Sequence, residues 1–337
     1  MDVRRATLTA ATIVAVTTAC TNVPLRMPAP VSGSAREEWY YIADDSVRHY
    51  VTEFGRGDTV VVLHGGFGAE HSYLLDAVMP LATRFHFVLY DQRGSLRSPA
   101  PDSTITIDRL VRDLDGLRQQ LGLEKVTFLA HSMGTVLSYA YIAQHSDRVR
   151  GLVLIGPVLP TYHEYHDLGV PPSDTARLRL VREELTAEQK ARQRAVTAAE
   201  HLDHTGLSDR EKTAVWRIAF ASANVCHVDR WREVHGGQIF YNPRVSSAVY
   251  RNTTQARRDS LWNDFLPALQ RFPGPISIIV GDCDFVDPRA ALWRYAAVKL
   301  PNAHLTVLRD AGHSAWVDQP QQFRMAVARA LEEATNR

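Results

Sequence analysis

One stretch, residues 129–134 with the sequence LAHSMG, constrains the fold of this chain more than any other. It joins a short apolar segment, 126–129, to a helix-like run, 135–143. A serine at a sharp strand-to-helix turn, with small residues two positions before and after it, is typical of a nucleophile elbow. The small residues here are Ala130 and Gly134, and Ala130 stands where glycine is usual. The alternative is that Ser132 caps an ordinary helix.

Apolar runs that fit buried strands alternate with segments of helical period along most of the chain. This alternation predicts βαβ units and a mostly parallel sheet flanked by helices. The length of 337 residues and the 45% hydrophobic content suit one large α/β domain with an insertion. Strands are expected at 38–42 and 47–54 (an edge hairpin), 59–63, 85–90, 126–129, 151–155, 276–280 and 304–308, and helices at 70–84, 107–121, 135–143, 288–300 and 319–334.

The pattern changes after Pro160, where the chain has several helical stretches and no strong strand. We expect a helical cap at 161–262, inserted after the sixth strand, between core segments 37–160 and 263–337. The cap helices are predicted at 177–202 (broken near Thr186), 209–222 and 245–257.

The first twenty residues differ from the rest. Two arginines precede the uncharged run 6–19, which is too short and too rich in threonine to span a bilayer comfortably. The pattern is that of a secretory signal peptide. It ends at Cys20 and resembles the cleavage box of bacterial lipoproteins, although Thr17 stands where leucine is preferred. We therefore expect an exported protein, either anchored to the membrane by lipid on Cys20 or secreted or periplasmic, with a linker at 21–36.

Charge and cysteine content limit the partners. The net charge is +1 and the chain has no basic run, so neither a nucleic acid nor another polyanion is expected to bind. Membrane contact is expected only through the N-terminal lipid. Besides Cys20 the chain has Cys226 and Cys283, which can pair in an oxidising compartment or remain free buried thiols.

Two later loops offer partners for the serine. A nucleophilic serine needs a base, and the base needs a group that orients it. The loops 281–288 (GDCDFVDP) and 309–316 (RDAGHSAW) each follow a predicted strand. Catalytic groups in such sheets lie at the carboxyl ends of strands. Asp282 and Asp287 compete with Asp284 for the role of the acid, and the spacing from Gly281 favours Asp284.

Four motifs occur in order along the chain: HGG at 64–66, DQRG at 91–94, Gly281-x-x-Asp284 and Gly312-His313. With them, residues 37–334 resemble an α/β-hydrolase of the group that includes prolyl aminopeptidases and related esterases. The resemblance implies the α/β-hydrolase fold and a chemistry that requires no metal and no organic cofactor.

The resemblance also implies roles for individual residues. Ser132 is the nucleophile, His313 is the general base, and Asp284 holds the imidazole in its working tautomer. The backbone N–H groups of Gly66 and Met133 form the oxyanion hole.

Other candidates have structural alternatives. Phe67, Met133 and Trp316 are expected to line the pocket, and each could instead be packing. His64 and His131 fall at motif positions that are usually structural. Two pairs of histidines could bind a metal but are expected on the cap surface. They are His163 with His166 and His201 with His204.

The prolyl aminopeptidase pattern fails at several points. Phe67 replaces a proline, the elbow is AHSMG, and Ser95-Leu96 departs from the DQRG loop. That group binds the substrate's amino group with cap carboxylates, for which the candidates are Glu183, Glu184, Glu188, Glu200 and Glu233.

The sequence predicts a serine hydrolase that cleaves an ester or a small amide through an acyl-enzyme, and favours a carboxylesterase. The substrate is then a small-molecule ester, or a short peptide or amide. The alternatives are a prolyl-aminopeptidase-like serine peptidase and a non-catalytic binding protein on the same fold.

Overall fold

The structure is a computed structural model that describes residues 36–161, 163–235, 245, 247–248, 251–252 and 264–336. The predicted signal peptide, Cys20 and nearly all of the linker lie outside these residues, as does most of the predicted helix 245–257. No helix within the described part of the chain is long and apolar enough to cross a membrane.

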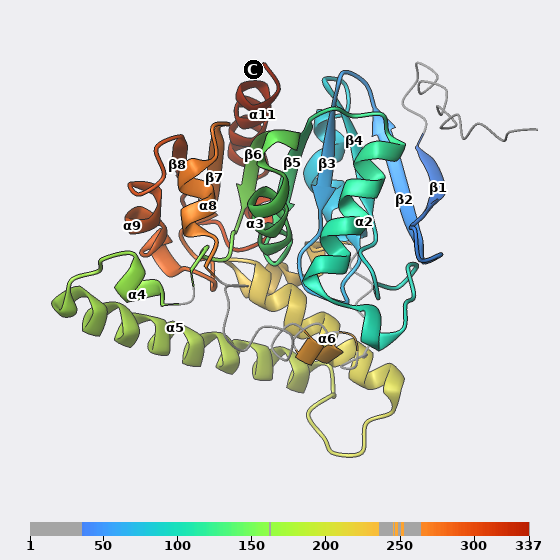
Figure 1. Ribbon diagram of the computed structural model, residues 1–337. Coiled ribbons are helices and arrows are strands. Elements are labelled where there is room, and N and C mark those ends of the chain that lie inside the picture. Colours follow the sequence, from blue (N-terminus) through green and yellow to red (C-terminus); the bar gives the residue numbers. More distant parts are fainter. Residues whose placement is uncertain are drawn as a thin grey trace, which may run out of the picture.

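An eight-stranded sheet forms the centre of the molecule (Figure 1). Its spatial order is β1-β2-β4-β3-β5-β6-β7-β8. The β1–β2 and β2–β4 pairs are antiparallel, and the other neighbours are parallel. The mostly parallel sheet and its edge hairpin are therefore confirmed. The strands are β1 (Glu37–Ile42), β2 (Arg48–Gly55), β3 (Asp58–Leu63), β4 (Phe85–Tyr90), β5 (Val126–His131), β6 (Val149–Ile155), β7 (Ile276–Gly281) and β8 (Ala303–Leu308).

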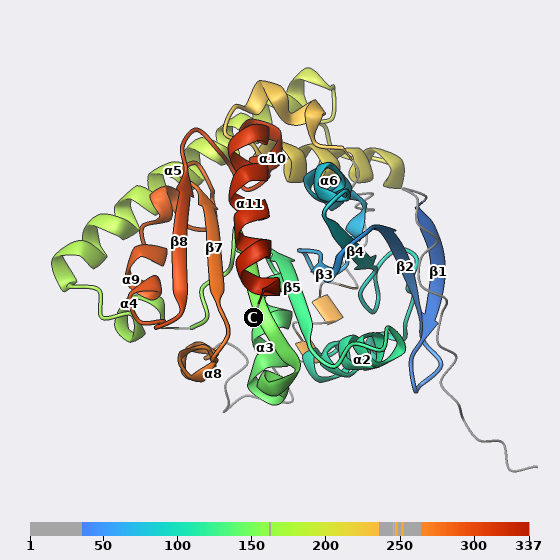
Figure 2. The same cartoon turned by 90° about the horizontal axis from the view of Figure 1, so that it is seen from above.

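Successive residues of the central strands pack on opposite faces of the sheet. Leu63 and Ala130 belong to one apolar cluster, and their neighbours Val62 and Leu129 belong to the other. Both faces are covered by helices, which explains why these strands are continuously apolar (Figure 2). The first cluster includes α2 (Ile107–Gln120), α3 (Gly134–His145), α8 (Leu266–Arg271) and α9 (Trp293–Ala297), and the second includes α1 (Leu75–Val78), α10 (Ala315–Asp318) and α11 (Pro320–Thr335).

Two predicted helices are shorter than expected. The segment 70–84 forms two 3-10 turns, His71–Leu74 and Met79–Leu81, around the single α-turn of α1. Pro80 lies in the second turn and has no N–H to continue an α-helix. The segment 288–300 begins as a 3-10 turn and becomes α9 only at Trp293, because Arg289 and Ala290 have φ angles of +64° and +53°.

We call residues 161–262, which lie between β6 and β7 in the sequence, the cap. The described helices of the cap are α4 (Glu164–Asp167), α5 (Pro172–Ala199), α6 (Asp209–Asn224) and a 3-10 turn, Val228–Glu233. The predicted break near Thr186 is wrong, because α5 is continuous over 28 residues. The Thr186 hydroxyl donates to the carbonyl of Arg182 one turn earlier, so it is satisfied within the helix.

Candidate active site

The turn at Ser132 has the backbone that an elbow requires. Ser132 lies between β5 and α3 with a φ of +52°, a strained conformation for a residue with a side chain. Its N–H donates to the carbonyl of Ile155 at 3.0 Å, and it does not cap α3. A Cβ at Gly134 would lie 2.4 Å from the Leu63 carbonyl oxygen, and one at Gly65 would lie 2.7 Å from the Ser132 Cβ. The close approach of β3 and its loop to the elbow explains both glycines.

Asp284 and His313 form a buried pair at the carboxyl ends of β7 and β8. The His313 Nδ1 lies 2.9 Å from Asp284 Oδ2 and 3.0 Å from Oδ1, and the side chains are 2% and 1% exposed. The N–H of Val286 donates to Asp284 Oδ1 at 2.9 Å, which fixes the carboxylate from its own loop. The pair can therefore hold an imidazole in one orientation and stabilise its protonated form.

Gly156 provides the space for this pair, and sequence reasoning missed it. A Cβ there would lie 2.6 Å from His313 Nδ1 and 2.8 Å from Asp284 Oδ2. The residue follows β6 at a φ of +49°. A glycine after a predicted strand carries no chemical signal, so only the three-dimensional structure assigns it a purpose.

The two competing carboxylates lie elsewhere. Asp287 accepts hydrogen bonds from the N–H groups of Leu292 and Trp293, and burial raises its pKa to about 6. Asp282 lines a cavity next to the cap. No hydrogen bond joins either described side chain to His313, so the structure brings Asp284 alone of the three to the histidine.

The predicted oxyanion residues lie in the loop after β3 and at the start of α3. Gly66 has a φ of +60° in the loop after β3, and its carbonyl accepts from the N–H of Ala69 at 2.9 Å. Met133 directly follows Ser132 at the start of α3. Both residues are partly exposed, as N–H groups that meet a substrate must be.

A chain of hydrogen bonds joins the loop after β3, the turn at Ser132 and the loop that holds His313. The N–H of Gly65 donates to the Tyr73 hydroxyl at 2.7 Å, and that hydroxyl lies 2.7 Å from His131 Nδ1. The His131 Nε2 lies 3.1 Å from the carbonyl oxygen of His313. Burial, and then the charge of His313, hold the pKa of His131 well below its usual range, so the ring is neutral. Nδ1 then accepts from Tyr73 and Nε2 donates to His313.

The DQRG loop packs beneath the oxyanion loop. The Gln92 side chain donates to the His64 carbonyl at 2.7 Å, and the Gln92 N–H donates to His64 Nε2 at 3.0 Å. Arg93 ion-pairs with Asp113 and Asp45 while its own side chain is fully buried. These contacts give His64 a structural role, as expected.

One buried group, Glu70, His71 and Asp91, has side chains of the kind that bind metals. Arg97 ion-pairs with both carboxylates, and His71 Nδ1 lies 2.7 Å from Asp91. Burial alone would raise the pKa of Asp91, but hydrogen bonds from His71 and Arg97 hold it below its ordinary value. The side chains of this group are therefore joined to one another and to Arg97 by ion pairs and hydrogen bonds.

The aromatic residues near the site differ in exposure. Trp316 is buried against His131, Tyr73 and Phe323, and Phe67 is buried in the cluster that includes α2 and α3. Phe285, which sequence reasoning did not single out, is 40% exposed, and its ring centroid lies 4.9 Å from that of His313. An exposed aromatic ring beside the histidine is thus supplied by the residue after Asp284.

The five cap glutamates that the sequence offered for binding an amine are exposed. Three of them pair with arginines: Glu188 with Arg192, Glu200 with Arg232, and Glu233 with Arg230. Glu183 and Glu184 are exposed on α5. Of the paired histidines, His166 contacts Asp167 and His204 lies 3.9 Å from Glu211. Such pairs on a surface contribute little to stability.

A sequence model of the alpha/beta hydrolase fold matches residues 58–320. The chain belongs to the α/β-hydrolase family. This α/β hydrolase is 39% identical over 109 residues to a proline iminopeptidase of Heyndrickxia coagulans, covering 32% of the chain and 38% of that relative. The match to a second, from Saccharolobus solfataricus, is 37% identical and covers 30% of the chain and 33% of that relative. A proline iminopeptidase of Lactobacillus delbrueckii subsp. bulgaricus is 25% identical over 79% of the chain and 86% of its own length.

Solved structures agree on the fold. An esterase from Thermogutta terrifontis superposes with a TM-score of 0.62 at 20% identity, over 89% of this chain and 99% of that one. A proline iminopeptidase-related protein from Thermus thermophilus superposes with a TM-score of 0.61 at 23% identity, over 89% of this chain and 98% of that one. At these identities the solved structures show the shared fold alone.

Proposed function

We propose that this α/β hydrolase is a serine hydrolase that cleaves a small ester through an acyl-enzyme. The observation that carries the proposal is the buried Asp284–His313 pair beside the strained turn at Ser132. A binding protein would have no use for this pair at that turn.

In the proposed reaction, the Ser132 hydroxyl attacks the ester carbonyl as His313 Nε2 takes its proton. The N–H groups of Gly66 and Met133 stabilise the oxyanion, and each such donor is worth about 10²–10³ in rate. His313 then protonates the departing alcohol, and Asp284 stabilises the imidazolium that exists between these steps. Water activated by His313 releases the acid, so no cofactor takes part.

The exposure of the candidate cap glutamates favours an ester as the substrate over a peptide with a free amine. A buried cationic amine is costly unless a carboxylate pairs with it. The five candidate glutamates are exposed and three of them pair with arginines, and the partly buried Glu164 pairs with Arg182. The apolar ring of Phe285 stands beside His313 instead. A prolyl-aminopeptidase-like peptidase is the second candidate, because several relatives are named proline iminopeptidases.

We expect p-nitrophenyl acetate and butyrate to be hydrolysed at least about tenfold faster than proline p-nitroanilide, in kcat/KM. The reason is that the five candidate glutamates of the cap are exposed to solvent, and the partly buried Glu164 is already paired with Arg182. Both substrates are assayed on one preparation, with Ser132→Ala as the blank. Comparable turnover of the proline amide, lost when one cap glutamate becomes glutamine, would establish the aminopeptidase.

We also propose that the cap covers the site.

We further propose that the chain is exported and that cleavage leaves Cys20 as a lipidated first residue. The uncharged run after Arg4 and Arg5 supports the export signal. Mass spectrometry of protein from the membrane fraction is expected to give a mature chain that begins at Cys20 and carries lipid, and Cys20→Ser is expected to lose it. An unmodified Met1 in cytosolic protein would contradict both proposals.

A further inference from the structure

A disulfide joins the cap to the loop after β7, which holds Asp284. Cys226 follows α6 in the cap, and Cys283 immediately precedes Asp284 in the loop after β7. The two cysteines lie 57 residues apart in the sequence, and their Cα atoms are 5.3 Å apart. The sequence left open whether they pair, and the structure pairs them.

The cap residues around Cys226 also contact the histidine loop. The carbonyl of Asn224 accepts from the N–H of Ser314 at 2.6 Å. The Asp318 Oδ2 accepts from the N–H of Cys226 at 2.9 Å and from the N–H of Gly312 at 2.8 Å. A Cβ at Gly312 would lie 2.7 Å from the Asn224 carbonyl oxygen. The segment 224–226 therefore packs against the loop of His313 and is covalently attached to the loop of Asp284.

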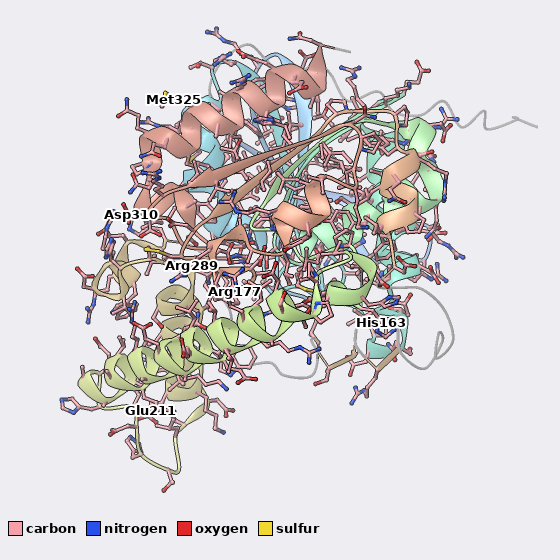
Figure 3. The ribbon with its side chains drawn as sticks, turned by 90° about the vertical axis from the view of Figure 1, so that its left-hand side faces the viewer. His163, Arg177, Glu211, Arg289, Asp310 and Met325 are labelled. Carbon is pink, nitrogen blue, oxygen red and sulfur yellow. A yellow bond between two sulfur atoms is a disulfide. The ribbon has the colours of Figure 1, made fainter. Side chains whose placement is uncertain are left out.

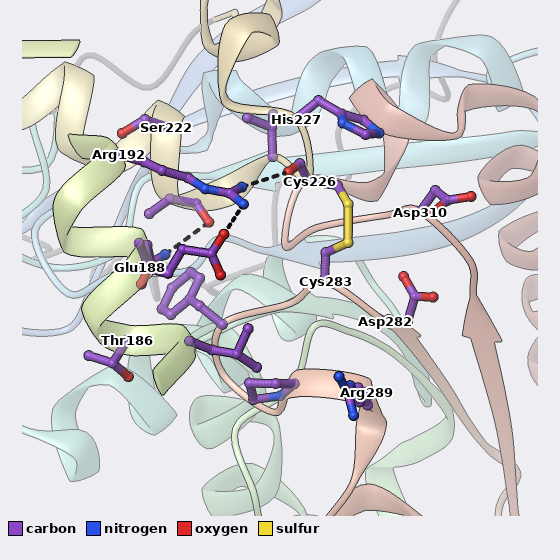
Figure 4. A pocket seen from close by; sticks show the side chains of 16 residues that line it. Thr186, Glu188, Arg192, Ser222, Cys226, His227, Asp282, Cys283, Arg289 and Asp310 are labelled. Carbon is purple, nitrogen blue, oxygen red and sulfur yellow. Dashed lines mark hydrogen bonds and ion pairs between the residues drawn. A yellow bond between two sulfur atoms is a disulfide. The ribbon is translucent and has the colours of Figure 1, made fainter. Parts of the chain in front are cut away.

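The disulfide is accessible to solvent. Cys283 is exposed and Cys226 is partly exposed. Both line a cavity of about 440 Å³ between α5, the end of α6 and the loop after β7 (Figure 4). Figure 3 shows this side of the molecule, with Arg289 and Asp310 on the core above α5. Phe285 also lines the cavity and contacts the His313 ring, so the cavity adjoins the catalytic pair.

We propose that Cys226–Cys283 is a thiol-exchange site through which a dithiol reductant lowers the hydrolase activity; this proposal rests on the proposed function. A thiolate of the dithiol attacks the exposed Cys283 Sγ, the Cys283–Cys226 bond breaks, and Cys226 leaves as a thiolate that takes up a proton. The second thiol of the reductant then attacks the mixed disulfide and releases Cys283. Two electrons pass to the protein, and the dithiol becomes a disulfide.

Reduction leaves the segment 224–226 held by hydrogen bonds alone and removes the covalent anchor beside Asp284. A small shift of Asp284 relative to His313 is costly, because misplacement of a catalytic group by about 1 Å can lower a rate by about 10²-fold. Reducing compartments keep such cysteines as thiols. The hydrolase is therefore held at low activity in a reducing compartment and becomes fully active in an oxidising one.

The test uses the full chain, oxidised or treated with dithiothreitol, and p-nitrophenyl butyrate as substrate. Alkylation and mass spectrometry count the thiols, and circular dichroism follows thermal unfolding. We expect reduction to lower kcat at least about tenfold, with cooperative unfolding kept above the assay temperature and activity restored on reoxidation. The double variant Cys226→Ser/Cys283→Ser is expected to have the low kcat and no response to dithiothreitol. Cys20→Ser, which keeps the pair, is expected to respond as the parent does.

Three results would overturn the proposal. The first is an unchanged kcat when mass spectrometry finds both thiols free. The second is loss of cooperative unfolding on reduction, which would make the disulfide a stabilising cross-link only. The third is a response to dithiothreitol that persists in the double variant. A failed proposed function is recognised separately, because oxidised protein would then neither hydrolyse the ester nor be labelled at Ser132 by a fluorophosphonate.

Discussion

Ser132→Ala is expected to lower kcat/KM for p-nitrophenyl esters by about 10⁴–10⁶-fold, because it removes the nucleophile from a group of residues that act together. The variant should fold normally, since it deletes one hydroxyl that does not cap α3 and the backbone strain at Ser132 remains. Turnover is measured at saturating and subsaturating substrate, with folding checked by thermal unfolding.

Two further variants make this experiment more specific. Ser173→Ala, on the exposed start of α5, is the matched control and should keep full activity. The double variant Ser132→Ala/His313→Ala should be little worse than Ser132→Ala alone, because triad losses are strongly non-additive. If Ser132→Ala retained most of the activity, the nucleophile would have to be sought elsewhere.

Asp284→Asn is expected to slow the reaction by about 10³–10⁴-fold, and Asp282→Asn by less than about threefold. An amide at position 284 can still hydrogen-bond to His313, but it favours the wrong imidazole tautomer and cannot stabilise the imidazolium. Asp282 instead lines the cavity beside the disulfide, and no hydrogen bond joins its described side chain to the histidine.

The comparison is informative because the two substitutions are chemically identical and lie on either side of Cys283. Steady-state kcat and KM are measured for both variants and for the parent, all in the oxidised form with the disulfide verified. Equal losses at the two positions would mean that disturbance of the loop, rather than the chemistry of one carboxylate, lowers the rate.

Much of the core was predictable, because a buried parallel sheet leaves a direct record in the sequence. Strands covered on both faces are mostly apolar, and β3, β4 and β7 have that pattern apart from a few polar residues such as His86 and Ser277. The loop that holds Asp284 was found for the same reason, since it follows β7. The loop that holds His313 follows the partly exposed edge strand β8, whose alternating apolar residues still indicated a strand. The hydrogen bonds between these two residues depend on the register of β7 with β8, which places Gly281 opposite Leu308.

What the sequence did not reveal has physical causes of its own. Helical periodicity at 288–300 does not show that Arg289 and Ala290 adopt positive φ angles, which loop packing imposes. The break expected in α5 was wrong because a threonine can satisfy its hydroxyl within the helix. Gly156 and Phe285 act through space on His313, and no local pattern indicates contacts between loops of different strands. The pairing of Cys226 with Cys283 likewise depends on where the cap lies.

The hydrogen-bond chain through Tyr73 and His131 limits how this protein can diversify. Tyr73 and His131 each donate one hydrogen bond and accept another, and both side chains are buried. A new residue at position 131 leaves the tyrosine O–H without an acceptor and the His313 carbonyl without its donor. A new residue at position 73 leaves the Gly65 N–H and an imidazole nitrogen unpaired, at a cost of about 1–3 kcal/mol for each group. Mutant libraries that vary position 131 should therefore vary position 73 at the same time. Substitutions at the two positions are energetically coupled, so stable and active variants are expected to carry matching changes at both.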